Sequence, residues 1–166
     1  QESDLVPIVE PEVLINGEHD INKCNEVTKM SLDALFEQLD IHGVFLGGTI
    51  LKPSMVISGD KNKNRADAKT VAEMTIERLL DSCPTDLGGV AFLSGGQSDN
   101  EATSHLNIMN TLNKNLPWRV TFSYARAIQQ SALNHWRGKD ANMPGAQEIL
   151  VSRAKACSDA SIGSLS

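Results

Sequence analysis

Four short apolar runs, separated by longer segments of a different periodicity, set the main limit on how this chain of 166 residues can fold. The runs cover residues 5–9, 44–51, 89–93 and 120–122. Most are rich in β-branched or aromatic residues, which is typical of strands buried on both faces of a sheet. We therefore predict four short, internal strands.

The segments between and after these runs carry apolar residues at steps of three and four, which is the spacing of one helix face. The predicted helices cover residues 22–39, 66–80, 98–112, 126–134 and roughly 141–158. Ser98 and Glu101 have the spacing of a capping box, and Pro144 suits a first helical turn. Alternating strands and helices predict a parallel sheet joined by crossover helices.

Residues capable of chemistry follow each apolar run: Glu10, Lys52, Ser94, and the pair Ser123 and Arg126. The carboxyl ends of parallel strands lie on one face of a barrel, so these side chains should converge. An open doubly wound sheet also places ligands at this edge, and the spacing alone does not separate the two folds. Four βα units would make up half of an eightfold barrel.

Composition excludes several classes of protein. A net charge of −6 argues against non-specific nucleic-acid binding, which needs a basic face. The apolar runs are too short to span a membrane, and the first residues do not resemble a signal peptide. We expect a cut end within a longer protein. The cysteines are Cys24, Cys83 and Cys157, which are too few and too scattered for a disulfide framework and favour a reducing compartment.

Lys52 and Glu10 each have two interpretations. Desolvation at an apolar strand end would lower the pKa of a lysine and free its amine as a nucleophile, whereas many lysines simply extend to water. Glu10 could act as a general acid and base, or it could form an ion pair with Lys52, and the two roles are compatible. Glu12, beyond Pro11, is expected to be a supporting hydrogen-bonding group.

Two strand-to-helix junctions suggest an anion site. In Ser94-Gly95-Gly96 the glycines allow backbone N–H groups to approach an anion, although an ordinary tight turn would also use them. Arg126 lies near a predicted helix start, where the helix dipole disfavours a cation unless an anion is bound. Together they match the phosphate site after the last two strands of many barrels. The four histidines lack metal-ligand spacing and are interpreted as structural or surface residues, so no metal is expected.

Four motifs together resemble class I fructose-bisphosphate aldolase: VPIVEPE at 6–12, GTILKPSMV at 48–56, FLSGGQS at 92–98 and TFSYARA at 121–127. The resemblance implies that Lys52 forms a Schiff base, that Glu10 transfers protons, and that a substrate phosphate binds at Ser94, Gly95, Gly96, Ser123, Ala125 and Arg126. Ala125 stands where the family usually has glycine.

The resemblance further implies a fold and a setting. The fold would be α/β, the last four βα units of a TIM (β/α)8 barrel, with residues 1–166 as one segment and 159–166 beginning a mobile tail. The implied activity is reversible cleavage of fructose 1,6-bisphosphate in glycolysis and gluconeogenesis, with no cofactor, in a cytoplasmic homotetramer. The family's upstream aspartate and lysines would be missing. A transaldolase-like lyase and a non-catalytic half-barrel interaction module are the alternatives.

Overall fold

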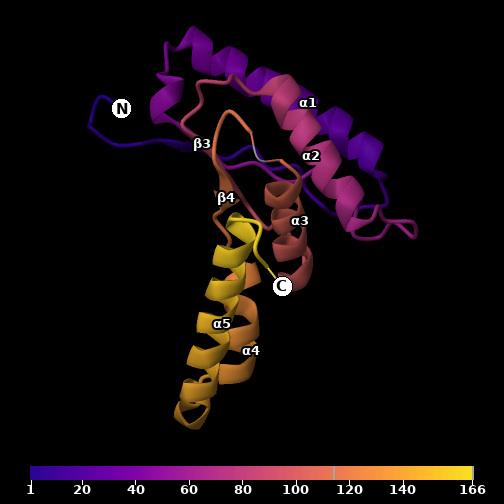
Figure 1. Cartoon of the computed structure of the whole chain (residues 1–166), viewed down its shortest axis with the longest axis vertical. Helices are drawn as coiled ribbons and strands as arrows, with labels where there is room; N and C mark the ends of the chain where they lie inside the picture. Colours follow the sequence, from indigo (N-terminus) through magenta and orange to yellow (C-terminus); the bar gives the residue numbers. More distant parts are fainter. Residues whose placement is uncertain (114, 166) are drawn as a thin grey trace.

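A computed structural model describes residues 1–113 and 115–165 of the chain (Figure 1). Strands and α-helices alternate along the chain, as the periodicity predicts, and two short 3-10 helices, η1 and η2, lie in the connections. The elements are β1 (Ile8–Val9), α1 (Ile21–Ile41), η1 (Leu46–Gly48), β2 (Ile50–Leu51), α2 (Ala68–Ser82), β3 (Gly89–Phe92), α3 (Asp99–Leu112), β4 (Val120–Phe122), α4 (Arg126–Trp136), η2 (Asp140–Asn142) and α5 (Met143–Ser161).

The four strands form one parallel sheet in the order β1-β2-β3-β4. The register pairs Val9 with Leu51, Leu51 with Val90, and Phe92 with Phe122. Each strand therefore pairs with the next one along the chain, and a helical crossover connects each pair. The prediction of an α/β fold with a parallel sheet is confirmed.

The two faces of the sheet differ in burial. Leu51, Val90 and Phe92 are essentially inaccessible and form part of the core that packs against the helices. Ile8 points to the other face, since side chains alternate along a strand, and it is 59% exposed. In the register Lys52 lies on the same face as Ile8, because Ile8 pairs with Ile50, two residues before Lys52.

Local sequence explains where most helices begin. The Asp20 and Asp67 carboxylates cap α1 and α2 by accepting backbone N–H bonds from Lys23 and Thr70, respectively. Ser98 and Glu101 form the predicted capping box of α3. Because Asp67 takes the cap position, α2 begins two residues later than predicted.

Three predicted strands are shorter in the structure, although β3 ends only one residue before the predicted bound, at Phe92. Of residues 44–51, only Ile50 and Leu51 pair in the sheet, because the preceding Leu46–Gly48 forms η1. A Cβ at Gly47 would lie 2.8 Å from the ring of Phe45, so the chain folds tightly over this ring. Residues 5–7 precede β1 in extended chain, although the Pro7 carbonyl still accepts a hydrogen bond from Ile50 N.

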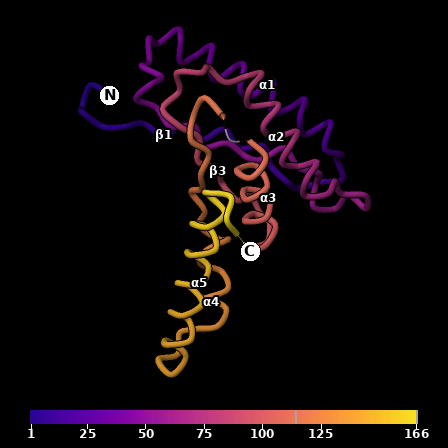
Figure 2. The backbone as a smooth tube through the Cα atoms, in the orientation of Figure 1, coloured from indigo at the N-terminus to yellow at the C-terminus, as the bar shows by residue number. Residues whose placement is uncertain are grey.

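Helices α4 and α5 form a hairpin that extends away from α1 and α2 (Figure 1). Residues 159–161, expected to begin the tail, form the last turn of α5, and beyond them Leu165 N donates to the Asn107 side chain of α3. The last described residues therefore lie beside α3 (Figure 2). Mobility of 159–166 stays a prediction, and Ser166 lies outside the described residues. No helix in the described ranges is long and apolar enough to cross a membrane.

Candidate active site

Glu10 and Lys52 are neighbours at the carboxyl ends of β1 and β2. They follow the paired residues Val9 and Leu51, and Lys52 N donates to the Val9 carbonyl over 2.8 Å. Lys52 Nζ lies 3.0 Å from Glu10 Oε1, and the Lys52 side chain is only 21% exposed. Both interpretations of Glu10 remain compatible, because an ion pair at this distance is also short enough for proton transfer.

A tight turn, Ser94-Gly95-Gly96-Gln97, follows β3. Gln97 N donates to the Ser94 carbonyl over 2.9 Å, and Gly95 and Gly96 have φ angles of 52° and 84°. Positive φ at both central residues is the geometry of a type I′ turn, which favours glycine. Within residues 1–113 and 115–165, no group accepts a hydrogen bond from Gly95 N–H or Gly96 N–H. The turn therefore presents two unpaired donors.

Arg126 is the first residue of α4, and its exposed side chain has no partner among the described residues. An ion pair with an acidic neighbour would also explain an arginine here, but the described part of the chain supplies no such partner. No side chain caps α4, so its first N–H groups are also uncapped. A cation and free helical donors at one place suit an anion better than they suit helix stability.

Ala125 fits its position without strain. Its φ is −97°, in the range that residues with a side chain adopt readily. The departure from the family's usual glycine therefore does not disturb the backbone, and the Ala125 N–H remains available. Ser123, two residues earlier, is exposed just beyond the end of β4.

The predicted site residues share the carboxyl edge of the sheet, but they lie at two different positions along the strand direction. Through the strand register Lys52 is level with Ala91, whereas Ser123 is level with Leu93 and Ser94 lies one residue further. At about 3.3 Å per residue, the Ser94 turn and Ser123 are roughly 7–10 Å further along the strand direction than Lys52. The amine and the carboxylate are therefore separated along the strands from the residues predicted to bind an anion.

Glu12 does not join the Glu10–Lys52 pair. It is exposed, and in the described residues no hydrogen bond or ion pair joins it to Glu10 or Lys52. Its supporting role stays a prediction.

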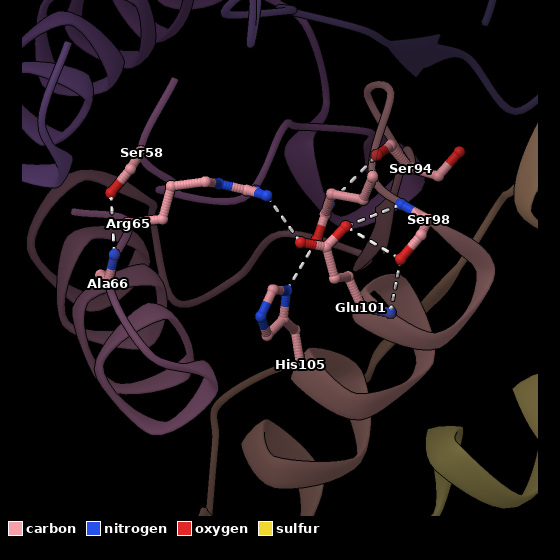
Figure 3. A network of polar contacts seen from close by, with 8 residues as sticks. Ser58, Arg65, Ala66, Ser94, Ser98, Glu101 and His105 are labelled. Carbon is pink, nitrogen blue, oxygen red and sulfur yellow. Dashed lines mark hydrogen bonds and ion pairs between the residues drawn. The ribbon is translucent and has the colours of Figure 1, made fainter. Parts of the chain in front are cut away.

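A polar network behind the Ser94 turn extends the predicted capping box by contacts that were not predicted (Figure 3). Arg65 Nη1 lies 2.8 Å from Glu101 Oε1, and Glu101 Oε2 accepts hydrogen bonds from Ser98 N and Ser98 Oγ, both over 2.9 Å. Burial alone would raise the pKa of Glu101, but the bonds from Ser98 and the charge of Arg65 outweigh it and lower that pKa. The capping box of α3 is thereby tied to the loop before α2.

Arg153 makes a second set of hydrogen bonds at the start of α3. From α5, its Nη2 donates to the Asp99 carbonyl over 2.7 Å and its Nε donates to the Ala127 carbonyl over 3.1 Å. Ser131 Oγ lies 2.5 Å from the Asp99 carboxylate. The first turns of α3 and α4, which border the two segments predicted to bind an anion, are thus held together. Sequence spacing carries no signal for contacts between residues so far apart.

His105 should make the protein sensitive to acid. Burial is the main cause that lowers its pKa to about 4; Glu101 opposes the shift and Arg65 adds to it. The unfolded chain takes up this proton near pH 6.5, whereas the folded chain resists until about pH 4. Stability should therefore be full above pH 6.5 and fall by about 3 kcal/mol as the pH drops to 4.

Urea unfolding at pH 7 and pH 4.5 measures this dependence. His105→Gln should lose less stability between the two pH values than the wild-type chain, because it has no imidazole to protonate. His135→Gln, which alters an exposed histidine of α4, should behave like the wild type. An identical loss in all three proteins would exclude His105 as the source.

Comparison with known proteins adds the decisive observation. The family model "Glycolytic: Fructose-bisphosphate aldolase class-I" matches residues 1–166. This chain belongs to the class I fructose-bisphosphate aldolase family. The cytoplasmic aldolase isozyme of Spinacia oleracea is 48% identical over 163 residues, which are 98% of this chain and 45% of that protein. Aldolase 2 of Caenorhabditis elegans is 45% identical, again over 98% of this chain and 44% of the relative.

Solved aldolase structures agree. The aldolase of Plasmodium falciparum, crystallised with TRAP and a small-molecule inhibitor, superposes with a TM-score of 0.93 at 45% identity. The match covers 98% of this chain and 46% of that one. The chain therefore spans about 45% of the length of the aldolases that it matches, and its four-stranded parallel sheet is consistent with half of a barrel.

Proposed function

We propose that this chain supplies the imine-forming and phosphate-binding part of a class I fructose-bisphosphate aldolase. The observation that carries the proposal is the pairing of Lys52 with Glu10 over 3.0 Å at the sheet edge where the Ser94 turn and Arg126 also lie. An amine, a carboxylate and an anion site are the groups that Schiff-base chemistry on a ketose phosphate requires.

In the proposed reaction, the neutral amine of Lys52 attacks the ketone carbon of fructose 1,6-bisphosphate. Glu10 first takes the ammonium proton of Lys52 and passes it to the carbonyl oxygen as the carbinolamine forms. It then moves a second proton from the nitrogen to the hydroxyl, which leaves as water, and a protonated imine remains. The C3–C4 bond then breaks and its electron pair moves into an enamine, while the family's upstream aspartate, outside this chain, would accept the proton of the C4 hydroxyl. Glyceraldehyde 3-phosphate leaves, and protonation and hydrolysis of the enamine release dihydroxyacetone phosphate and Lys52.

The anion site orients the ketone. Gly95 and Gly96 N–H groups, Ser94, Ser123, the Ala125 backbone and Arg126 would bind the phosphate on the ketone side. The roughly 7–10 Å between the levels of Lys52 and the turn leaves room for the lysine side chain and the carbon atoms between the two ends. Binding energy at the phosphate would hold the carbonyl beside the amine.

The biological setting is part of the same proposal. Two plant relatives are named cytoplasmic or cytosolic aldolases, and the family description is glycolytic. We infer a cytoplasmic enzyme of glycolysis and gluconeogenesis that acts on a sugar phosphate without a metal or cofactor and assembles as a homotetramer.

Borohydride trapping tests the covalent step. An active form of the protein is incubated with dihydroxyacetone phosphate and sodium borohydride, digested, and analysed by mass spectrometry. The peptide that contains Lys52 should gain the mass of the reduced adduct, and omission of borohydride should abolish the gain. Labelling of another lysine, or no labelling at all, would refute Lys52 as the imine residue and favour a non-catalytic half-barrel.

A further inference from the structure

A buried hydrogen-bond chain lies directly behind the Ser94 turn. His105 Nδ1 is 2.7 Å from Gln97 Oε1, and Gln97 Nε2 donates to the Ser94 carbonyl over 3.1 Å. His105 and Gln97 are only 5% and 7% exposed, so water competes little for these bonds. Figure 3 shows His105 on α3 below the segment that carries Ser94 and Ser98.

The chemistry of the three groups determines which atom donates and which accepts in each of these hydrogen bonds. A carbonyl only accepts hydrogen bonds, so the amide of Gln97 must turn its NH2 group toward Ser94. Its Oε1 then faces the imidazole, and His105 must carry its proton on Nδ1. A flipped amide would place two acceptors against each other. The Ser94 carbonyl thus selects one orientation of the glutamine, and His105 with its proton on Nδ1 stabilises that orientation.

The backbone converts this orientation into a direction for Gly95 N–H. The Ser94 carbonyl accepts from both the backbone and the side chain of Gln97, so it is fixed toward the interior. In a planar trans peptide the carbonyl and the following N–H point in opposite directions. The Gly95 N–H is therefore turned away from His105, and among the described residues it meets no acceptor.

We propose that His105 and Gln97 are positioning residues that hold the Ser94–Gly95 peptide with its N–H ready for the phosphate. This inference rests on the proposed phosphate role of the turn. The pair acts through the backbone and never touches the ligand, which distinguishes it from Ser94 and Arg126. Without the pair, the peptide can rotate and the donor is no longer fixed in advance.

Titration of the isotope-labelled chain with inorganic phosphate, followed by NMR, tests the proposal. The Gly95 and Gly96 amide signals of the wild type should shift on titration. His105→Leu and Gln97→Met should weaken the phosphate Kd about 2- to 10-fold, the effect of one lost hydrogen bond. His105→Gln restores a donor and should recover most of the affinity, while His135→Leu, on exposed α4, should match the wild type.

Two outcomes of the titration would contradict the positioning role. Wild-type affinity and unchanged Gly95 and Gly96 signals in His105→Leu would overturn the positioning role while leaving the phosphate turn intact. If phosphate does not shift these signals in the wild type, both the turn and this inference are wrong, but the Lys52 assignment still depends on borohydride trapping.

A measurement on the wild type covers the case in which a variant does not fold. The ring nitrogen shifts of neutral His105 should report the proton on Nδ1, and a proton on Nε2 would refute the hydrogen-bond chain.

Discussion

Replacing Lys52 with arginine should reduce turnover of fructose 1,6-bisphosphate by roughly 10⁴- to 10⁶-fold in an active enzyme that contains this chain, the range seen when a catalytic group acting as part of a unit is removed. Arginine keeps the positive charge that lies 3.0 Å from Glu10, so the ion pair and the fold should survive. A guanidinium stays protonated at neutral pH and cannot form the imine. The measurement is kcat from a coupled cleavage assay, together with a melting curve.

Lys155→Arg is the matched control, because Lys155 also pairs with a carboxylate, Asp159, but lies on α5 away from the sheet edge. It should retain wild-type turnover. If Lys52→Arg kept substantial cleavage activity, Lys52 would not be the covalent residue. Loss of activity with an equally large loss of melting temperature would instead indicate that Lys52 is needed for stability.

Replacing Arg126 with alanine should lower kcat/KM for the bisphosphate about 10- to 150-fold, which corresponds to one charge-assisted hydrogen-bonding contact of about 1.5–3 kcal/mol. KM should rise much more for the bisphosphate than for an analogue that lacks the phosphate on the ketone side. Stability should change little, because the described residues give Arg126 no partner to lose.

Two variants make this result specific. Arg126→Lys keeps a charge but not the two parallel donors of a guanidinium, and it should recover only part of the activity. Arg119→Ala removes an exposed arginine at the amino end of β4, opposite the proposed site, and should leave both substrates unaffected. Equal losses for phosphorylated and unphosphorylated substrates in Arg126→Ala would reject the phosphate role.

The strand ends were predictable because a buried strand requires apolar residues, whereas a reactive residue directly after it is polar. An apolar run that stops at Lys52 or Ser94 shows where a strand leaves the core, and a parallel sheet then brings such ends to one edge. The capping box at Ser98 was equally visible, since it depends on two residues three positions apart.

The lengths of the strands and the side-chain contacts behind the site could not be predicted from local sequence patterns. Apolar character at residues 44–48 suggested a strand, but Gly47 folds over Phe45 and gives η1 instead. His105 contacts Gln97 eight residues away, a separation with no distinctive pattern. The hydrogen bond from Arg153 to the Asp99 carbonyl forms only when α5 packs beside α3.

The backbone angles around the proposed anion site determine which substitutions each position can accept. Gly95 and Gly96 sit at positive φ, and a Cβ at Gly96 would lie 3.1 Å from Ile15 Cγ2, so any substitution there meets both backbone strain and crowding. Position 125, at φ −97°, carries neither restriction. Position 125 can therefore change its side chain without losing its backbone donor, while positions 95 and 96 are confined to glycine.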